Sequence, residues 1–208
     1  MTSWVDKHYW KKADGLAHQV HRQLLSQVCQ RATYFYEASY IENLKYTEKI
    51  MQASGVIDFI LTVTSDQNLK EPDNLGYCLT SDEHCEIEII TYLPKYYHIS
   101  RLLKSKKYSL DLLNVIRHEI EHALQSGAYK VNDAKMERYD RSDRNYMLDP
   151  AEVPAYVHGF RIASKNDLNF CKEASKFIGL HGESLGLEEE EIDHTKKVWL
   201  SYLKNLKN

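Results

Sequence analysis

The segment His118-Glu119-Ile120-Glu121-His122 contains residue types that can bind a metal ion and move a proton. A helical turn takes about 3.6 residues, so His118 and His122 lie on one helix face, where each imidazole can offer a nitrogen to zinc. Glu119 lies roughly 100° further round the helix, so it can flank the ion without binding it. The pattern H-E-x-x-H predicts a zinc site with Glu119 as the general base.

A charged helix face in solvent, or a coincidental motif in a protein without metal, is the alternative interpretation of this segment. Two features of residues 110–125 favour the metal site. Apolar residues form a stripe nearly opposite the histidines, so the histidine face is free to line a cleft. Gly127 offers a C-cap just beyond this predicted helix. The stripe consists of Leu113, Ile116, Ile120, Ala123 and Leu124.

A third protein ligand is needed, because a catalytic zinc site uses three protein ligands and keeps the fourth position open. The downstream segment Asp149-Pro150-Ala151-Glu152 predicts a helix start, with Asp149 as the N-cap and Pro150 at the first helical position. Glu152 then has two interpretations, a capping-box acid or a metal ligand. We favour the ligand because of the motif upstream, and Asp149 and His158 are the alternatives.

The rest of the chain predicts helices around a small sheet. Residues 13–54 contain one glycine and no proline, and Leu16, Val20 and Leu24 recur at helical spacing, so one long helix or two are expected. Residues 56–64, 76–80 and 85–93 predict strands, and the short turn between the last two predicts an antiparallel hairpin. Further helices are expected over 150–164, 170–180 and 187–208, with a break at Gly182 and Gly186 and a long polar connection over 126–146.

These elements predict an α+β fold, mostly helical, with a small antiparallel sheet of about three strands packed on the helix that carries His118 and His122. The 208 residues, 43% of them hydrophobic, suffice for one domain with a real core. Within it we distinguish an N-terminal helical segment (1–55), a central core (56–164) and C-terminal helices (165–208).

Charge and composition argue against several classes of partner and location. The net charge is −3 and there is no basic stripe, so no nucleic-acid partner is expected. No run of about 18 apolar residues could span a membrane, and the first 17 residues lack the apolar core of a signal peptide. The four cysteines therefore predict reduced thiols of a cytoplasmic protein. The spacing of Cys78, His84 and Cys85 fits no standard zinc knuckle.

The order of strand, hairpin, His-Glu-Ile-Glu-His helix and second helix with Glu152 resembles the zincin metallopeptidases. Within them it is similar to the gluzincins, especially their compact, minigluzincin-like forms, over residues 56–163. The resemblance implies Zn²⁺ bound by His118, His122 and Glu152, with Glu119 as general base. Metzincins do not fit, because they continue with a glycine and a histidine where this chain has Gln125 and Ala128.

The resemblance implies a zinc-dependent endopeptidase, rather than an exopeptidase, acting on a protein or peptide substrate. Zinc would lower the pKa of its water towards roughly 7, and Glu119 would take the proton. Tyr156 is our preferred donor to the oxyanion, with Tyr146 and His158 as alternatives. We expect the strand Glu86–Tyr92 to bind an extended peptide by strand addition. The competing interpretation is a non-catalytic zinc-binding structural or interaction protein with a zincin-like fold.

Overall fold

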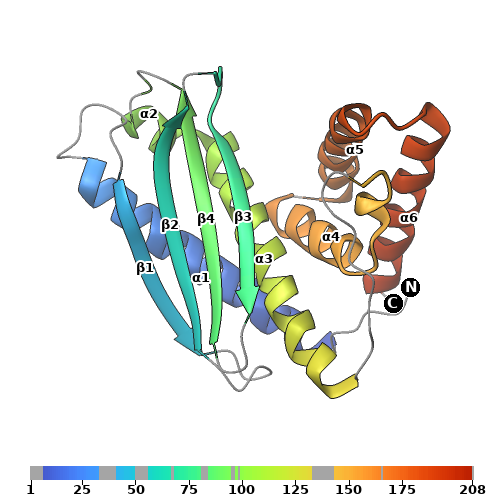
Figure 1. The fold of residues 1–208 in the computed structure, drawn as a ribbon, viewed down its shortest axis with the longest axis horizontal. Coiled ribbons are helices and arrows are strands. Elements are labelled where there is room, and N and C mark those ends of the chain that lie inside the picture. Colours follow the sequence, from blue (N-terminus) through green and yellow to red (C-terminus); the bar gives the residue numbers. More distant parts are fainter. Residues whose placement is uncertain are drawn as a thin grey trace.

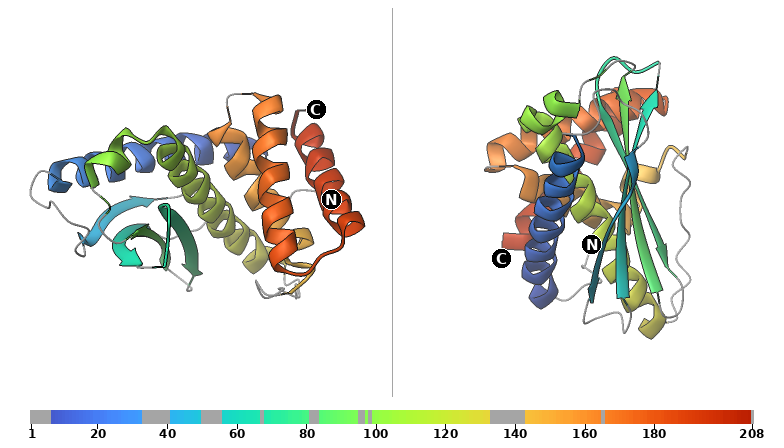
Figure 2. Two further views of the ribbon diagram at one scale, coloured as in Figure 1. Left: turned by 90° about the horizontal axis from the view of Figure 1, so that it is seen from above. Right: turned by 90° about the vertical axis from the view of Figure 1, so that its left-hand side faces the viewer.

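Helices α1 and α3 pack across one face of a four-stranded sheet, and α4, α5 and α6 gather beyond the end of that layer (Figures 1 and 2). The computed structural model describes residues 7–32, 41–49, 56–66, 68–80, 84–94, 97, 99–132, 143–164 and 166–207. The expected α+β class is confirmed. In chain order the elements are α1 (Lys7–Ala32), β1 (Ile41–Lys49), β2 (Val56–Asp66), β3 (Asp73–Thr80), β4 (His84–Pro94), α2 (Ile99–Lys104), α3 (Lys106–Asn132), the 3₁₀ turn η1 (Tyr146–Leu148), α4 (Glu152–Ala163), α5 (Asp167–Ser184) and α6 (Glu189–Lys207).

The sheet has the strand order β1-β2-β4-β3 and is mixed rather than purely antiparallel. The predicted β3–β4 hairpin is confirmed, and β1 also pairs antiparallel with β2. β2 and β4 run parallel, which the sequence analysis did not anticipate. β4 lies between β2 and β3 in the sheet, so the strand that follows the hairpin runs in the same direction as β2.

Strand β1 corrects the prediction of helix over residues 13–54 and of a wholly helical segment 1–55. Helix α1 ends at Ala32, and residues 41–49 pair with β2, with Leu44 opposite Leu61 and Lys49 opposite Val56. The apolar spacing is least regular in this stretch. Its conformation is therefore set by the unpaired backbone groups along the edge of β2, which a strand satisfies and a helix does not.

The first hydrophobic core lies between the sheet and helices α1 and α3. Alternate residues of β2 and β4, such as Leu61 and Ile89, are fully buried, whereas Glu86 and Glu88 on the opposite face of β4 are half-buried. The apolar stripe predicted on α3 is buried here, as is the stripe Ala17, Val20 and Leu24 of α1. One face of each helix therefore packs on the sheet, which fixes how α3 is rotated about its axis.

Helix α3 is longer at both ends than the predicted 110–125. Ser105 is its N-cap, because its Oγ accepts the backbone N–H of Tyr108 (3.2 Å). The prediction of a C-cap at Gly127 is wrong, since α3 continues to Asn132. Among the described glycines only Gly186 has the positive φ typical of a helix end, and it separates α5 from α6. Gly182 lies inside α5, one turn before that break.

A second hydrophobic core joins η1 and α4 to α5 and α6. Its centre is Trp199 of α6, which is fully buried and donates its indole N–H to the carbonyl of Met147 (2.9 Å). The predicted helices over 150–164, 170–180 and 187–208 are thus confirmed, with different bounds. Helix α4 packs against α3 as well as against α5 and α6, and the division of the chain at residue 164 remains a prediction.

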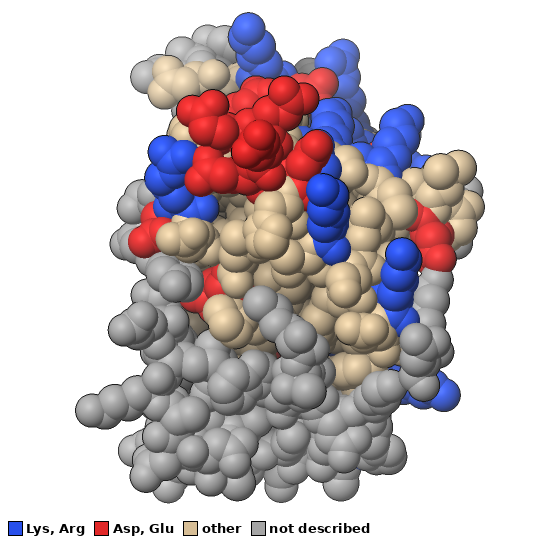
Figure 3. All heavy atoms as spheres, turned by 90° about the vertical axis from the view of Figure 1, so that its right-hand side faces the viewer, with Lys and Arg blue, Asp and Glu red and all other residues tan. Residues whose placement is uncertain are grey.

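The surface over α5 and α6 has one conspicuous charged area. Acidic side chains gather where α5 passes into α6, and basic side chains lie around them (Figure 3). The first turn of α6 supplies Glu189, Glu190 and Glu191, where negative charge is favoured by the helix dipole. No helix among the described residues is long and apolar enough to cross a membrane.

Candidate metal centre

Helices α3 and α4 bring three candidate ligand atoms together. Nε2 of His118 lies 3.0 Å from Nε2 of His122, and the Glu152 carboxylate oxygens lie 3.3 Å and 3.4 Å from these two nitrogens. Three ligands about 2.05 Å from a tetrahedral zinc ion would be separated by roughly 3.3 Å, the edge of the tetrahedron. The three residues therefore form a group that could hold a metal ion.

The choice of Glu152 over the alternative third ligands follows from where each side chain lies. Asp149 Oδ1 accepts the N–H of Ala151 (2.7 Å) in the turn before α4, whose N-cap is Ala151 rather than the predicted Asp149. His158 packs against Trp10, with ring centroids 5.0 Å apart, and is not part of the ligand group. Glu152 Oε2 is buried and lies 3.3 Å from His118 Nε2. The Glu152 carboxylate therefore faces the two histidines, in a group that could hold a metal ion.

Gln125, one turn beyond His122, orients that imidazole. Its Nε2 donates to the carbonyl of Ala151 (2.9 Å), which leaves Oε1 as the acceptor facing Nδ1 of His122 (3.1 Å). His122 Nδ1 must then carry a proton, and in the neutral ring Nε2 is the free lone pair. In metal sites a hydrogen-bond partner on the other ring nitrogen fixes both the tautomer and the orientation of a histidine. The same amide links α3 to the residue before Glu152.

The charges of the three candidate ligands are strongly coupled. Burial lowers the pKa of His122, but the hydrogen bond and charge of Glu152, with the charge of Glu119, outweigh it and raise the pKa to about 9. Burial raises the pKa of Glu152, but its hydrogen bonds to His118 and His122 outweigh that effect and lower it well below its usual value. In the metal-free chain His122 is therefore protonated at neutral pH, and its positive charge lies beside the negative charge of the Glu152 carboxylate.

Glu119 lies beside the ligand group without belonging to it. Its Oε1 is 3.9 Å from His118 Nε2, and the residue is 3% exposed. Gly76 of β3 lies directly over it, since a Cβ atom at Gly76 would approach Glu119 Cγ to 2.7 Å. Glycine is needed here because no larger residue leaves room for the carboxylate. The Glu119 side chain is therefore held between α3 and strand β3 at the edge of the sheet.

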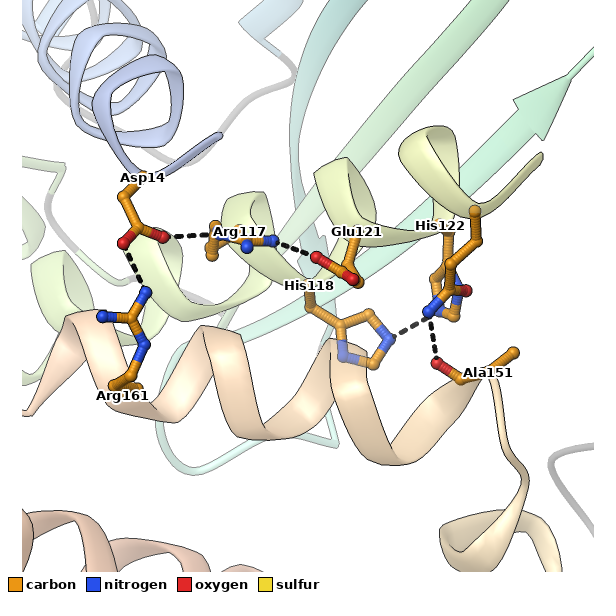
Figure 4. A network of polar contacts seen from close by, with 8 residues as sticks. Asp14, Arg117, His118, Glu121, His122, Ala151 and Arg161 are labelled. Carbon is orange, nitrogen blue, oxygen red and sulfur yellow. Dashed lines mark hydrogen bonds and ion pairs between the residues drawn. The ribbon is translucent and has the colours of Figure 1, made fainter. Parts of the chain in front are cut away.

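The charged residues within and beside the motif are buried, which overturns the alternative of a solvated helix face. Arg117 and Glu121 are both 0% exposed and form an ion pair across one turn of α3 (2.9 Å). Asp14 of α1 accepts from Arg117 Nε (2.9 Å) and from Arg161 of α4, so it joins three helices (Figure 4). This network fixes the side of α3 from which the histidines project.

The close approach of α4 to α3 depends on Gly159. A Cβ atom at this position would lie 2.7 Å from the main-chain oxygen of Asn114 on α3. Backbone atoms in a helix cannot move aside as a flexible side chain can. The small residue therefore sets the distance between the two helices that carry the candidate ligands.

Tyr156 lies next to the ligand group, where the sequence placed it. Its ring is 4.4 Å from that of His118, and it stacks on Trp199 at 5.0 Å with 19° between the ring planes. Tyr146, the alternative donor, packs edge-on to Tyr156 at 6.3 Å and is buried. Tyr156 therefore supports His118 through ring packing, and its role as a hydrogen-bond donor remains a prediction.

The strand expected to bind substrate lies elsewhere in the sheet. Glu86–Tyr92 belongs to β4, which has β2 on one side and β3 on the other, so its backbone groups are already paired. Strand addition there is excluded. The edge strand next to α3 is β3. Among the described strands its only neighbour in the sheet is β4. Tyr77 and Leu79 project from it and are exposed.

The chain was also compared with known proteins. It matches no protein-family model, no curated protein and no solved structure. The similarity to gluzincins therefore rests on the motif and on the positions of its residues.

Three residues important to the site were missed in the sequence. Gln125 follows His122 by three positions on the same helix face, and that spacing could have identified it as a partner. Gly76 carried a weaker signal, a glycine within a predicted strand, which often marks a close backbone approach. Asp14 had none, because its partners Arg117 and Arg161 are far away in the sequence.

Proposed function

We propose that this protein is a zinc-dependent peptidase that hydrolyses peptide bonds, with His118, His122 and Glu152 holding Zn²⁺. The observation that supports this most strongly is the convergence of three side chains. The two imidazole Nε2 atoms lie 3.0 Å apart, and the two oxygens of the Glu152 carboxylate lie 3.3 Å and 3.4 Å from one nitrogen each. These separations suit a small tetrahedral ion, and two imidazoles with one carboxylate are ligands that zinc accepts. The metal identity rests on this donor chemistry.

Glu119 is the residue to which we assign proton transfer. A bound zinc ion would act as a Lewis acid, polarising the scissile carbonyl and acidifying a water molecule. The Oε1 atom of Glu119 lies 3.9 Å from His118 Nε2, so this carboxylate would be the group that takes up a proton at the site and returns it to the leaving amine. Its burial beside Gly76 restricts the carboxylate to this place.

The substrate in this proposal is an extended peptide lying along β3. β3 is the last strand of the described sheet on this side, and extended peptides can bind beside such a strand by strand addition. β3 also positions Gly76 over Glu119, so a peptide on this edge would pass close to the base. Backbone N-methylation of a cleaved peptide, away from the scissile bond, should therefore abolish its cleavage while a side-chain substitution at the same residue is tolerated.

The deciding experiment combines metal analysis with cleavage of a proteome-derived peptide library read by mass spectrometry. The wild-type chain should bind one zinc ion and cut peptides. Glu119→Gln should keep the zinc and lose cleavage by about 10²-fold or more, because only the proton acceptor is removed. Glu183→Gln, an exposed glutamate on α5, is the matched control and should behave as wild type.

Each other outcome has a definite reading. Cleavage by Glu119→Gln at the wild-type rate would refute the assignment of the base. Full zinc occupancy in Glu152→Ala would refute the ligand set. If the wild-type chain binds zinc but cleaves no peptide, the interpretation as a peptidase is refuted and the protein is a non-catalytic zinc-binding protein.

A further inference from the structure

Cys78 of β3 and Cys85 of β4 bring two thiols into contact on the β3–β4 hairpin. Their Sγ atoms lie 3.5 Å apart, and no disulfide joins them. Cys85 is buried, whereas Cys78 is half-buried, so a small oxidant can reach the pair from the side of Cys78. The hydrolysis proposed above uses neither thiol. Two thiols in contact are the arrangement from which a disulfide can form.

The strand register shows what the formation of this bond would require. Cys78 lies opposite Ile87 and Cys85 lies opposite Thr80, so the two cysteines are diagonal neighbours on one face of the hairpin. The Cα atoms of diagonal neighbours are typically about 7–8 Å apart, whereas a disulfide spans about 4.4–6.8 Å. The bond must therefore draw the end of β3 and the start of β4 together. A bond that forms only with such a displacement is more easily reduced than one of ideal geometry, so it would be reversible rather than structural.

The same part of β3 lies over Glu119, the candidate general base. Gly76 precedes Cys78 by two residues, so both residues face α3 from the same side of the strand. A Cβ atom at Gly76 would approach Glu119 Cγ to 2.7 Å. Because the contact is this close, a displacement of β3 must change the space around the Glu119 carboxylate.

The electrostatics of Cys85 also show that the pair and Glu119 are close together. A hydrogen bond from the Cys78 thiol lowers the pKa of Cys85, although burial and the nearby charge of Glu119 oppose this effect. A lower pKa increases the share of the thiolate, which is the nucleophilic form of cysteine.

We propose that Cys78 and Cys85 form a reversible disulfide under oxidation, and that this bond displaces β3 at Glu119 and slows peptide cleavage while zinc stays bound. The three candidate zinc ligands lie on α3 and α4, outside the strand that is displaced. The effect on cleavage rests on the function proposed above, whereas the formation of the disulfide does not.

Oxidation by hydrogen peroxide is a balanced reaction of two steps. A thiolate attacks one peroxide oxygen, the O–O bond breaks, and the hydroxide that leaves takes up the proton released by the thiol, which gives a sulfenic acid and water. The second thiol attacks the sulfenic sulfur, and its proton leaves with the displaced hydroxyl group as water while the S–S bond forms. The two thiols lose two electrons and two protons, and one peroxide becomes two water molecules.

The disulfide is tested on the zinc-loaded wild-type chain, treated with hydrogen peroxide and then alkylated with N-ethylmaleimide in denaturant. The tryptic peptide 71–95 contains Cys78 and Cys85 and no other cysteine. After oxidation its mass should be lower by two hydrogen atoms and it should carry no maleimide. Reduction with tris(2-carboxyethyl)phosphine before alkylation should restore both maleimides. A peptide that keeps both maleimides after peroxide, or that is oxidised only to sulfinic acids, would overturn the proposal.

The effect on the site is measured on the same samples as zinc content and peptide cleavage. Oxidised wild type should keep its zinc and cleave about tenfold or more slowly, because a small displacement near the reacting groups is costly, and reduction should restore the rate. Cys78→Ala, checked by circular dichroism, should cleave at the same rate with and without peroxide. Cys171→Ser, a partly buried cysteine on α5, is the matched control and should respond as wild type.

The contrary outcomes separate this proposal from the proposed function. Unchanged cleavage by the oxidised wild type, loss of zinc on oxidation, or an equal loss of cleavage in Cys78→Ala would refute the effect through β3. If the reduced wild-type chain binds zinc but cleaves no peptide, the proposed peptidase is refuted and the effect on cleavage with it. The mass of peptide 71–95 decides on the disulfide in either case.

Discussion

At the scale of single residues, the candidate metal centre is defined by which atoms carry protons. His118 and His122 present Nε2 to one point, and Glu152 presents two oxygens to the same point. Gln125 determines the tautomer of His122, because its own amide orientation is fixed by the carbonyl of Ala151. The zinc affinity should therefore depend on a residue that never touches the ion.

Gln125→Ala is predicted to weaken zinc binding by about 10–100-fold, the usual effect of removing a hydrogen-bond partner of a metal-binding histidine. The affinity is measured by competition with a fluorescent chelator. Gln23→Ala, an exposed glutamine on α1, is the matched control and should leave the affinity unchanged. An unchanged affinity in Gln125→Ala would show that Gln125 does not orient His122.

Zinc affinity is also predicted to rise with pH. The pKa of His122 in the metal-free chain is raised to about 9, so below that pH a zinc ion must displace a proton from Nε2. The apparent affinity should increase nearly tenfold per pH unit from about pH 7 to 8 and level off above about pH 9. The same chelator competition measures this, and a flat profile between pH 7 and 9 would contradict the raised pKa.

At the scale of elements, the site depends on the distance between α3 and α4. These helices are connected by a chain segment of which residues 133–142 lie outside the described part, so their packing cannot be inferred from a short turn. It is set by Gly159 against the backbone of Asn114 and by the bond from Gln125 to Ala151. A change in this distance should move Glu152 away from both histidines together.

Gly159→Ala is predicted to destabilise the protein although alanine is the better helix former. The gain in helix propensity is about 1 kcal/mol, and the added methyl group must push α4 from the Asn114 carbonyl at an overpacking cost of about 1–3 kcal/mol. We expect a net loss of up to about 2 kcal/mol in urea unfolding, together with weaker zinc binding.

Gly179→Ala provides the matched control for that substitution. Gly179 also lies within a helix, but a Cβ atom there would meet nothing within 4 Å. The variant should gain up to about 1 kcal/mol in stability and keep its zinc affinity. If both variants were stabilised alike, the contact between Gly159 and Asn114 would not limit the approach of the helices.

At the scale of the whole molecule, two hydrophobic cores meet at the candidate metal centre. α3 belongs to the core against the sheet, and α4 belongs to the core with α5 and α6. The candidate ligands are one link between the two cores. Asp14 of α1 is another, since it pairs with Arg117 on α3 and with Arg161 on α4. Arg117 is fully buried, so the loss of this acid would leave a buried cation less well compensated.

Asp14→Ala is therefore predicted to lower the free energy of unfolding by about 3 kcal/mol, the lower end of the range for breaking a buried ion pair. The lower end applies because the Asp14 side chain is 22% exposed. Urea denaturation measures the change. Glu71→Ala removes the exposed pair with Lys107 and should leave the stability unaltered. A loss no larger than in this control would mean that Asp14 does not hold the helices together.

The sequence by itself determined the parts whose signals are local. The spacing of His118 and His122 needs only the period of a helix, and the alternation in β2 and β4 needs only the pleat of a strand. The position of Glu152 near a helix start could also be predicted, because Asp149 and Pro150 mark that start. These features arise within a few residues, so the chain carries them without reference to its fold.

Only the tertiary structure decided what depends on distant partners. Residues 41–49 form a strand because β2 offers an unpaired edge, and β4 lies in the centre of the sheet because β3 reverses beyond it. Asp14 finds Arg117 and Arg161 only after three helices have packed, and Gly76 meets Glu119 only once β3 lies on α3. Backbone pairing and burial of charge are satisfied across the whole chain, so no local pattern could specify these contacts.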